Sequence, residues 1–235
     1  MLKSSAVCIA FAALLCFLVG CGGQAGGKSV KTSKKAAPKK PAETFVPPPP
    51  PPKVDQNAFA DVDDAMAKVE ELVKDQDEKT GQELLKVETW LQMQGDKIAA
   101  DLAAKVKDTA GPLPTRITAC RVLMRLGPAS ATTVLVEATA SEPRELRVKA
   151  IECLGRLKPT SKQIVEKIIS LIDDQDYEQR KAAIGALANI GKPAAAAKDR
   201  LQAILNDAKE DETIRSLAKK ALKEVDPRKG LMNAY

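Results

Sequence analysis

Residues 174–193 read DQDYEQRKAAIGALANIGKP, and this stretch decides the fold because its pattern returns along the chain. The central motif is Arg-x-x-Ala-x-x-x-Leu, and its successive copies start 31, 33 and 35 residues apart, at Arg116, Arg147, Arg180 and Arg215. A degenerate copy without the arginine, Leu84-x-x-Val87-x-x-x-Leu91, precedes them by 32 residues. Apolar residues three and four apart share one helix face. A period of this length predicts a repeat of two short helices and two turns.

Helix-stopping residues separate the two helices of each repeat. The boundaries read Leu126-Gly127-Pro128, Leu157-Lys158-Pro159 and Ile190-Gly191-Lys192-Pro193, each with a stop before a proline suited to the first turn of the next helix. Residues 132–136 are rich in β-branched side chains, but their place in the repeat predicts a second helix. Helical spacing begins before the repeats, with Phe59, Val62, Met66, Val69 and Val73 on one face.

The repeated pattern resembles that of the HEAT-repeat family. In order, it consists of an acidic turn, an arginine, alanines, Leu-Gly, a proline and a second helix. The resemblance is to the short bacterial type first noted in phycobilin lyases, and it covers roughly residues 80–226. Tetratricopeptide repeats have a similar length but lack this arginine. The family implies an all-α fold, a right-handed α-solenoid of HEAT-like helix pairs in which each pair covers the apolar face of its neighbour.

The repeated arginines allow two interpretations. They can form an anion-binding ladder, or, as the family implies, they can hydrogen-bond to the acidic turns as structural residues. Trp90 falls on a core position of the first repeat, which favours packing over a binding platform.

The first twenty residues have the layout of a signal peptide, with Lys3 before an apolar run from Ala6 to Val19. This run is shorter than the about 20 residues that cross a bilayer. The sequence Leu18-Val19-Gly20-Cys21 resembles the lipobox of bacterial lipoproteins, which implies cleavage before Cys21 and its acylation. An ordinary secretory signal cut elsewhere is the alternative. Gly22, rather than an aspartate, follows the cysteine and favours the outer membrane, facing the periplasm.

Of the net charge of +6, five charges belong to the segment that follows the anchor, and Lys3 supplies the sixth. Residues 22–57 carry seven lysines against Glu43 and Asp55, and they end in a run of prolines from Pro47 to Pro52. Such a segment cannot bury enough apolar surface to order itself, so a disordered Lys/Pro-rich tether is expected. It serves either as a spacer or as a polybasic strip that binds cell wall or anionic lipid. Residues 58–235 hold equal numbers of basic and acidic residues.

Two cysteines remain in the repeats, Cys120 and Cys153. An exported protein meets an oxidising compartment, so they either pair or stay as buried thiols. They sit four and six residues after equivalent arginines, and the sequence leaves open whether those helix flanks face each other.

An enzyme is disfavoured because the chain has no histidine, the commonest general base and metal ligand. Neither a phosphate-binding loop nor a nucleophile elbow is present in the sequence. We therefore expect no catalytic residues, no metal, no cofactor and no small-molecule substrate. The neutral repeats with few aromatic residues also disfavour nucleic acid. Bilin-lyase activity is not expected of an exported chain.

The remaining function class is a binding module. We expect a cleaved signal peptide (1–20), a lipid anchor and tether (21–57), a helical repeat domain (58–226) and a short tail (227–235). The outward positions of the second helices form the candidate surface for a protein partner in the envelope. These positions are Thr133, Glu137, Lys162, Glu166, Lys167, Lys198 and Gln202.

Overall fold

The computed structural model describes residues 52–74 and 78–227, and all regular structure in these two ranges is helical. The α-helices are α1 (Val62–Lys74), α2 (Glu78–Met93), α3 (Ala99–Lys107), α4 (Leu113–Leu126), α5 (Pro128–Ala138), α6 (Arg144–Leu157), α7 (Lys162–Ser170), α8 (Tyr177–Ile190), α9 (Lys198–Asn206) and α10 (Glu212–Val225). Short 3-10 turns precede α3 and α9 and follow α7: η1 (Gly95–Ile98), η3 (Lys192–Ala197) and η2 (Leu171–Asp173). The all-α prediction is confirmed, and the β-branched stretch 132–136 lies within α5.

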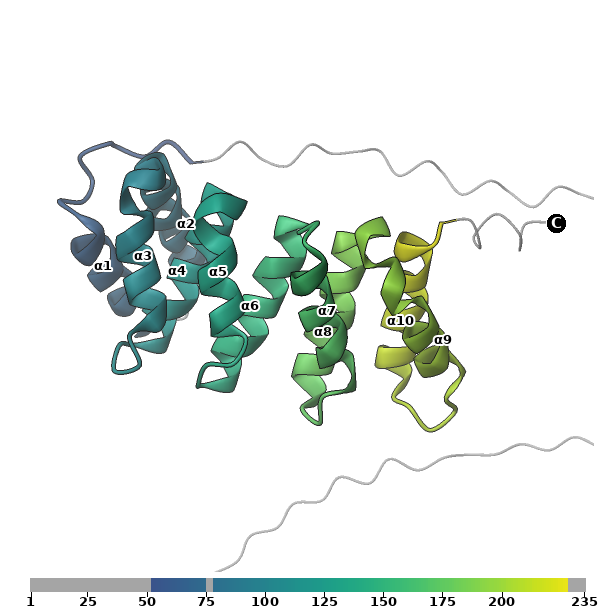
Figure 1. The fold of residues 1–235 in the computed structure, drawn as a ribbon. Coiled ribbons are helices and arrows are strands. Elements are labelled where there is room, and N and C mark those ends of the chain that lie inside the picture. The colour runs from purple at the N-terminus through teal and green to yellow at the C-terminus, as the bar shows by residue number, and fades with distance from the viewer. Residues whose placement is uncertain (1–51, 75–77, 228–235) are drawn as a thin grey trace, which may run out of the picture. The chain divides into compact units, whose positions relative to one another are not determined.

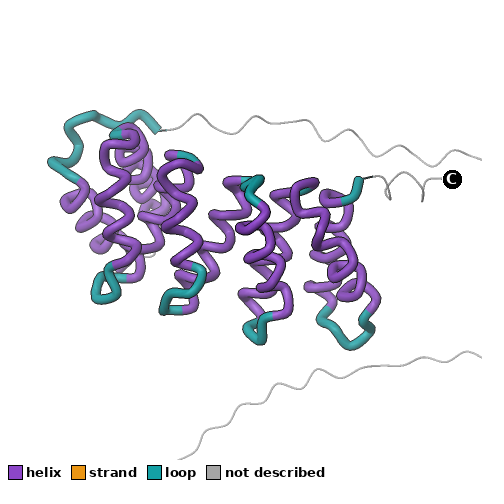
Figure 2. The backbone as a smooth tube through the Cα atoms, viewed as in Figure 1, coloured by secondary structure: helices purple, strands orange, loops and turns teal. Residues whose placement is uncertain are grey.

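Local residues set the ends of α8 and the start of α10. By contrast, Pro159 does not start the next helix as the sequence predicts, because α7 begins at Lys162. Asp176 caps α8, and its side chain accepts hydrogen bonds from the backbone N–H groups of Glu178 and Gln179. Asp211 caps α10 in the same way. At the other end of α8, Gly191 has a φ of +71°, a conformation that suits glycine, and its N–H bonds to Leu187. Loops are confined to the ends of the helices (Figure 2).

The helices stack in chain order (Figure 1). The first helices of the repeats, α4, α6, α8 and α10, lie next to one another, with α2 before them. The second helices α3, α5 and α9 pack closely on the first helix of the following repeat, respectively α4, α6 and α10. The last helix, α10, therefore has a partner in α9.

Small and branched residues fill the space between the helices. The alanines of the repeated motif are fully buried, as are the leucines of its first three complete copies: Ala119, Ala150, Ala183, Ala218, Leu123, Leu154 and Leu187. The last leucine, Leu222, is half-buried at the end of the stack. The repeated motif thus marks the inner face of the first helices, as the sequence predicts.

The segment before α1 is held by Trp90. This side chain is buried, donates its indole N–H to the Gln56 carbonyl at 2.8 Å, and meets the Phe59 ring edge-on at 5.3 Å. Packing is therefore the role of Trp90. Phe59 lies outside the helix, because α1 begins at Val62, three residues later than the apolar spacing predicts.

Helices α6 and α8 approach so closely that Gly155 has no space for a side chain. A Cβ at this residue would lie 2.5 Å from Cα and 2.6 Å from Cβ of Ala186. Gly185, on α8, is also helical, but nothing lies within 4 Å of its would-be Cβ. The two helical glycines therefore allow a matched pair of substitutions, one at a crowded position and one at an open position.

We expect Gly155→Ala to lower the free energy of unfolding by about 1–3 kcal/mol, because the helices must separate. Gly185→Ala should raise it by up to about 1 kcal/mol through helix propensity alone. Urea unfolding followed by far-ultraviolet circular dichroism compares them. Equal effects of the two substitutions would contradict the close approach of α6 and α8.

Candidate functional site

The predicted interaction residues lie on three second helices. Thr133 and Glu137 are on α5, and Lys162, Glu166 and Lys167 are on α7; all five are exposed. Lys198 and Gln202, on α9, are half-buried. Figure 1 shows α5, α7 and α9 in succession along one side of the stack. We call these seven residues the second-helix face.

Several residues of the second-helix face already have partners. Glu137 pairs with Lys107 at 2.6 Å, Lys162 with Glu166 at 3.6 Å, and Gln202 bonds to Asn206 at 3.1 Å. Lys198 pairs with Asp226 at 2.8 Å, which turns it toward the end of α10. The exposed pairs restrain their side chains only weakly. Lys167 has no ion pair within the described residues. Because the second-helix face holds lysines and glutamates in nearly equal numbers, it is polar with little net charge.

The repeated arginines bond to backbone carbonyls at the turns. Arg116 is buried, and it donates from Nε to the Val106 carbonyl at 3.1 Å and from Nη1 to the Glu142 carbonyl at 2.8 Å. It thereby joins the turn before its own helix to the turn of the next repeat. Arg147 bonds to the Ser141 carbonyl and to the Glu142 carboxylate at 2.6 Å.

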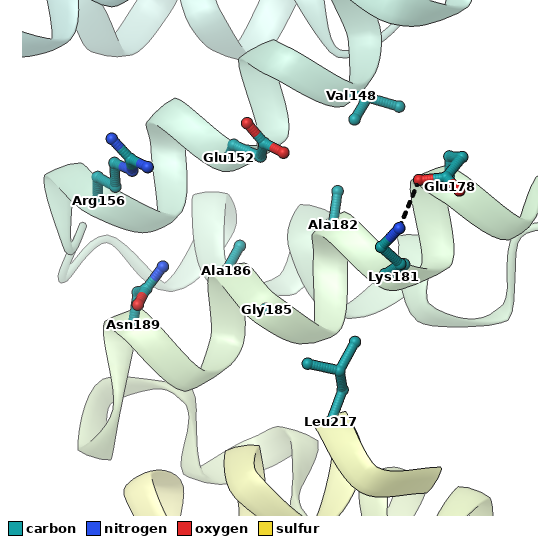
Figure 3. A pocket seen from close by; sticks show the side chains of 10 residues that line it. All are labelled: Val148, Glu152, Arg156, Glu178, Lys181, Ala182, Gly185, Ala186, Asn189 and Leu217. Atoms are coloured by element: carbon teal, nitrogen blue, oxygen red, sulfur yellow. Dashed lines mark hydrogen bonds and ion pairs between the residues drawn. The ribbon is translucent and has the colours of Figure 1, made fainter. Parts of the chain in front are cut away.

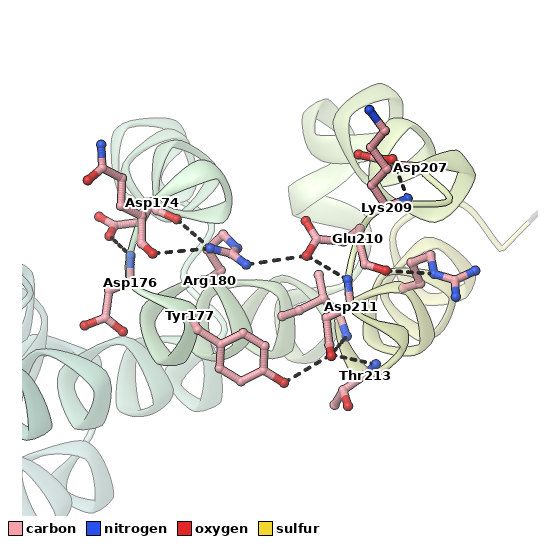
Figure 4. A network of polar contacts seen from close by, with 12 residues as sticks. Asp174, Asp176, Tyr177, Arg180, Asp207, Lys209, Glu210, Asp211 and Thr213 are labelled. Atoms are coloured by element: carbon pink, nitrogen blue, oxygen red, sulfur yellow. Dashed lines mark hydrogen bonds and ion pairs between the residues drawn. The ribbon is translucent and has the colours of Figure 1, made fainter.

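Arg180 is the centre of a larger polar network (Figure 4). It donates to the carbonyls of Asp174 and Gln175, and across to the Glu210 carboxylate at 3.4 Å. The Tyr177 hydroxyl donates to Asp211 at 3.2 Å. Backbone N–H groups of the α10 start, followed by the Tyr177 hydroxyl, lower the pKa of the Asp211 carboxyl. The network ties the start of α8 to the start of α10.

Arg215 makes a single bond, from Nε to the Glu210 carbonyl at 3.3 Å. Arg147, Arg180 and Arg215 thus bond to carbonyls of the turns that precede their helices, and Arg116 bonds to the end of α3 and to the turn before α6. This geometry agrees with the structural interpretation.

A buried ion cluster that the sequence analysis missed joins α2 to α4. Glu88 is 1 % exposed and pairs with Arg121 at 3.0 Å and Arg125 at 2.8 Å. Its Oε2 atom lies close to Arg125 without the angle of a hydrogen bond, so that contact is an ion pair only. Glu88 occupies a position where the next three repeats place Cys120, Ile151 and Ile184, and this charged residue among apolar ones was the available signal.

Cys120 and Cys153 are buried free thiols on α4 and α6. Burial raises the pKa of Cys120 to about 12, and the nearby Cys153 adds to that shift. Burial also raises the pKa of Cys153 to about 11. Both thiols therefore lie in the core, on helices α4 and α6, which pack on each other.

A groove of about 320 Å³ lies on the outer side of the first helices, over Gly185 (Figure 3). Ala182, Gly185 and Ala186 of α8 line it, with Leu217 of α10 on one side and side chains of α6 on the other. The sequence analysis did not single out Gly185. The signal was present in the repeats, because the equivalent positions of the other three complete copies hold long charged residues: Arg121, Glu152 and Lys220.

Neither a metal site nor a membrane-spanning helix occurs in residues 52–74 and 78–227. No three acidic or cysteine side chains gather there in a way that could hold an ion. None of the helices in these ranges is long and apolar enough to cross a bilayer. Cys21, the signal peptide, most of the tether and the last eight residues lie outside the described residues.

Comparison with known proteins supports the fold. Residues 134–223 match the family model for HEAT repeats. Among solved structures, the chain is similar to one in the complex of CpcE and CpcF of phycocyanin lyase from Nostoc sp. PCC7120. The two share 20 % identity with a TM-score of 0.52, over 84 % of this chain and 73 % of that one. No curated protein matches. Residues of this chain form an all-α, HEAT-like helical repeat domain.

The arginine bonds predict unequal costs of substitution. Arg116→Met keeps the aliphatic stem but removes two bonds that a buried arginine makes to backbone carbonyls, so the free energy of unfolding should fall by about 2–4 kcal/mol. Arg215→Met, which removes one bond from a half-buried residue, should cost under about 1 kcal/mol. Chemical denaturation of both variants tests this order. If Arg215→Met cost as much as Arg116→Met, the turn-linking role of Arg116 would be wrong.

The buried thiols predict an alkaline loss of stability. Both folded pKa values lie above the ordinary 9.0, so the folded state favours the protonated thiols; this contribution is complete below pH 9 and is lost as the pH rises above it. Between pH 8 and pH 10 we expect a loss of about 1 kcal/mol per thiol. The Cys120→Ala/Cys153→Ala variant, which shares every lysine with the parent, should show a shallower slope. Parallel slopes would contradict the burial of these thiols as free groups.

Proposed function

We propose that this chain is a membrane-anchored lipoprotein whose helical repeat domain is a non-catalytic scaffold for another protein of the cell envelope. The observation that carries the proposal is the second-helix face. Its polar side chains on α5 and α7 are exposed, and these two helices follow one another along one side of the stack (Figure 1). A mixed, nearly neutral surface suits a protein partner better than a charged polymer.

The similar solenoid in the phycocyanin lyase structure supports a binding role by analogy, since that structure is a complex of CpcE and CpcF. The analogy concerns the fold alone. The anchor rests on the lipobox, Leu18-Val19-Gly20-Cys21, and Gly22 supports the outer membrane, facing the periplasm. The absence of histidine from the chain supports the proposal that the scaffold is not an enzyme.

Crosslinking in intact cells tests anchor and scaffold together. The unmodified chain should fractionate with membranes and crosslink to an envelope protein, and Cys21→Ala should move it to the soluble fraction. Lys162→Glu/Lys167→Glu on α7 should reduce the crosslinked partner severalfold, because it reverses the charge of the second-helix face. The control is Lys219→Glu/Lys223→Glu on α10, which makes the same charge change at two other exposed lysines.

Loss of the partner with the α10 variant alone would contradict a binding role for the second-helix face. A version lacking residues 58–226 separates the competing hypothesis. If this version keeps the partner, or adsorbs to envelopes in a salt-dependent manner while the repeats bind nothing, the lysine-rich tether is the binding element. Cys21→Ala protein that stays in the membrane fraction would contradict the anchor.

A further inference from the structure

The groove over Gly185 is an open site on a rigid floor. Gly185 lies within a regular helix, so no turn requires a glycine at this position. Nothing lies within 4 Å of the position that its Cβ would occupy. On either side, Ala182 and Ala186 are buried in the packing of α8. A ligand can therefore reach the α8 backbone here, whereas long side chains occupy the same position in the other three complete copies of the motif.

The charges around the groove are unevenly compensated. Glu152 pairs with Lys149 at 2.6 Å, and Glu178 pairs with Lys181 at 2.9 Å. Arg156 is exposed and has no ion-pair or hydrogen-bond partner within the described residues. Figure 3 shows Arg156 and Asn189 at the same end of the groove, on α6 and α8 respectively. This end offers a cation and an amide donor to an incoming group.

The dimensions suit a short peptide. Val148 and Arg156 both line the groove. Their positions on α6 are eight residues apart, which corresponds to about 12 Å at about 1.5 Å per residue. An extended peptide covers that distance with about four residues. The volume of about 320 Å³ is at the lower end of the range for small-molecule pockets, which favours one or two side chains over a cofactor.

We propose that this groove binds a short acidic segment of a partner protein, which places an apolar side chain over Gly185 and a carboxylate between Arg156 and Asn189. Leu217 closes the groove beside the apolar side chain. A carboxylate fits because it accepts two charge-assisted bonds from a guanidinium and can take a third from an amide. The inference rests on the proposed function, in which the domain binds another protein, and it assigns a second contact surface on the opposite helices.

A peptide titration followed by amide NMR spectra tests the groove directly. The protein is the full chain with Cys21→Ala, to prevent acylation. The probes are acetylated hexapeptides with one leucine and one glutamate at separations of one to four residues, and the same peptides with glutamine or lysine instead of glutamate. We expect a glutamate peptide to shift the signals of Gly185, Ala186 and Asn189 in a saturable manner, with the lysine peptide inactive.

Two pairs of variants make the test specific. Gly185→Leu fills the groove and should abolish binding, whereas Gly81→Leu, at an exposed helical glycine of α2 that also has no neighbour within 4 Å, should leave it unchanged. Arg156→Glu should weaken binding about tenfold. Lys97→Glu, at an exposed lysine of η1 outside both proposed surfaces, should have no effect.

Three outcomes would overturn the proposal: no saturable shift with any peptide, equal binding of the lysine peptides, or shifts of the groove signals that depend on protein concentration alone and so indicate a second copy. This titration needs no envelope partner. A negative result here therefore leaves the crosslinking test of the scaffold intact. Conversely, peptide binding without any crosslinked partner would support the proposed peptide site in the groove and contradict the proposed scaffold function.

Discussion

The close approach of successive first helices is the constraint on which the rest of the structure depends. Each helix pair leaves an apolar face bare, and the next pair covers it only if small residues let the backbones meet. Gly155 against Ala186 is the tightest example, since even a methyl group has no space there. Because every such contact joins neighbours in the chain, the stability of the domain is approximately a sum of local interfaces.

The hydrogen bonds of the repeated arginines follow from this stacking of the helices. Helices that lie side by side bring their turns together, so an arginine at the start of one helix reaches the carbonyls of two turns, as Arg116 does. The same side chains are consequently engaged within the fold, and the capacity to bind a partner passes to the exposed faces of the helices.

Two such faces differ in their chemistry. The second-helix face is polar and largely self-paired, with Lys167 as its unpaired cation in the described part of the chain. The outer side of the first helices is mostly filled by long side chains, except where Gly185 opens a groove beside Arg156. The first surface suits broad contact with a protein, and the second suits a single inserted side chain. A scaffold with both faces can hold a partner through two kinds of contact.

The sequence by itself determined the helices, their caps and their inner faces. These features depend on neighbours within one or two turns, so the spacing of residues such as Ala183 and Leu187 and the stop at Gly191 were sufficient. It also showed that the second helices carry exposed polar residues. The tertiary structure decided that Cys120 and Cys153 are both buried as free thiols, that Lys198 turns to Asp226, and that Gly185 leaves a groove. These depend on distances between helices, which repeat spacing does not encode.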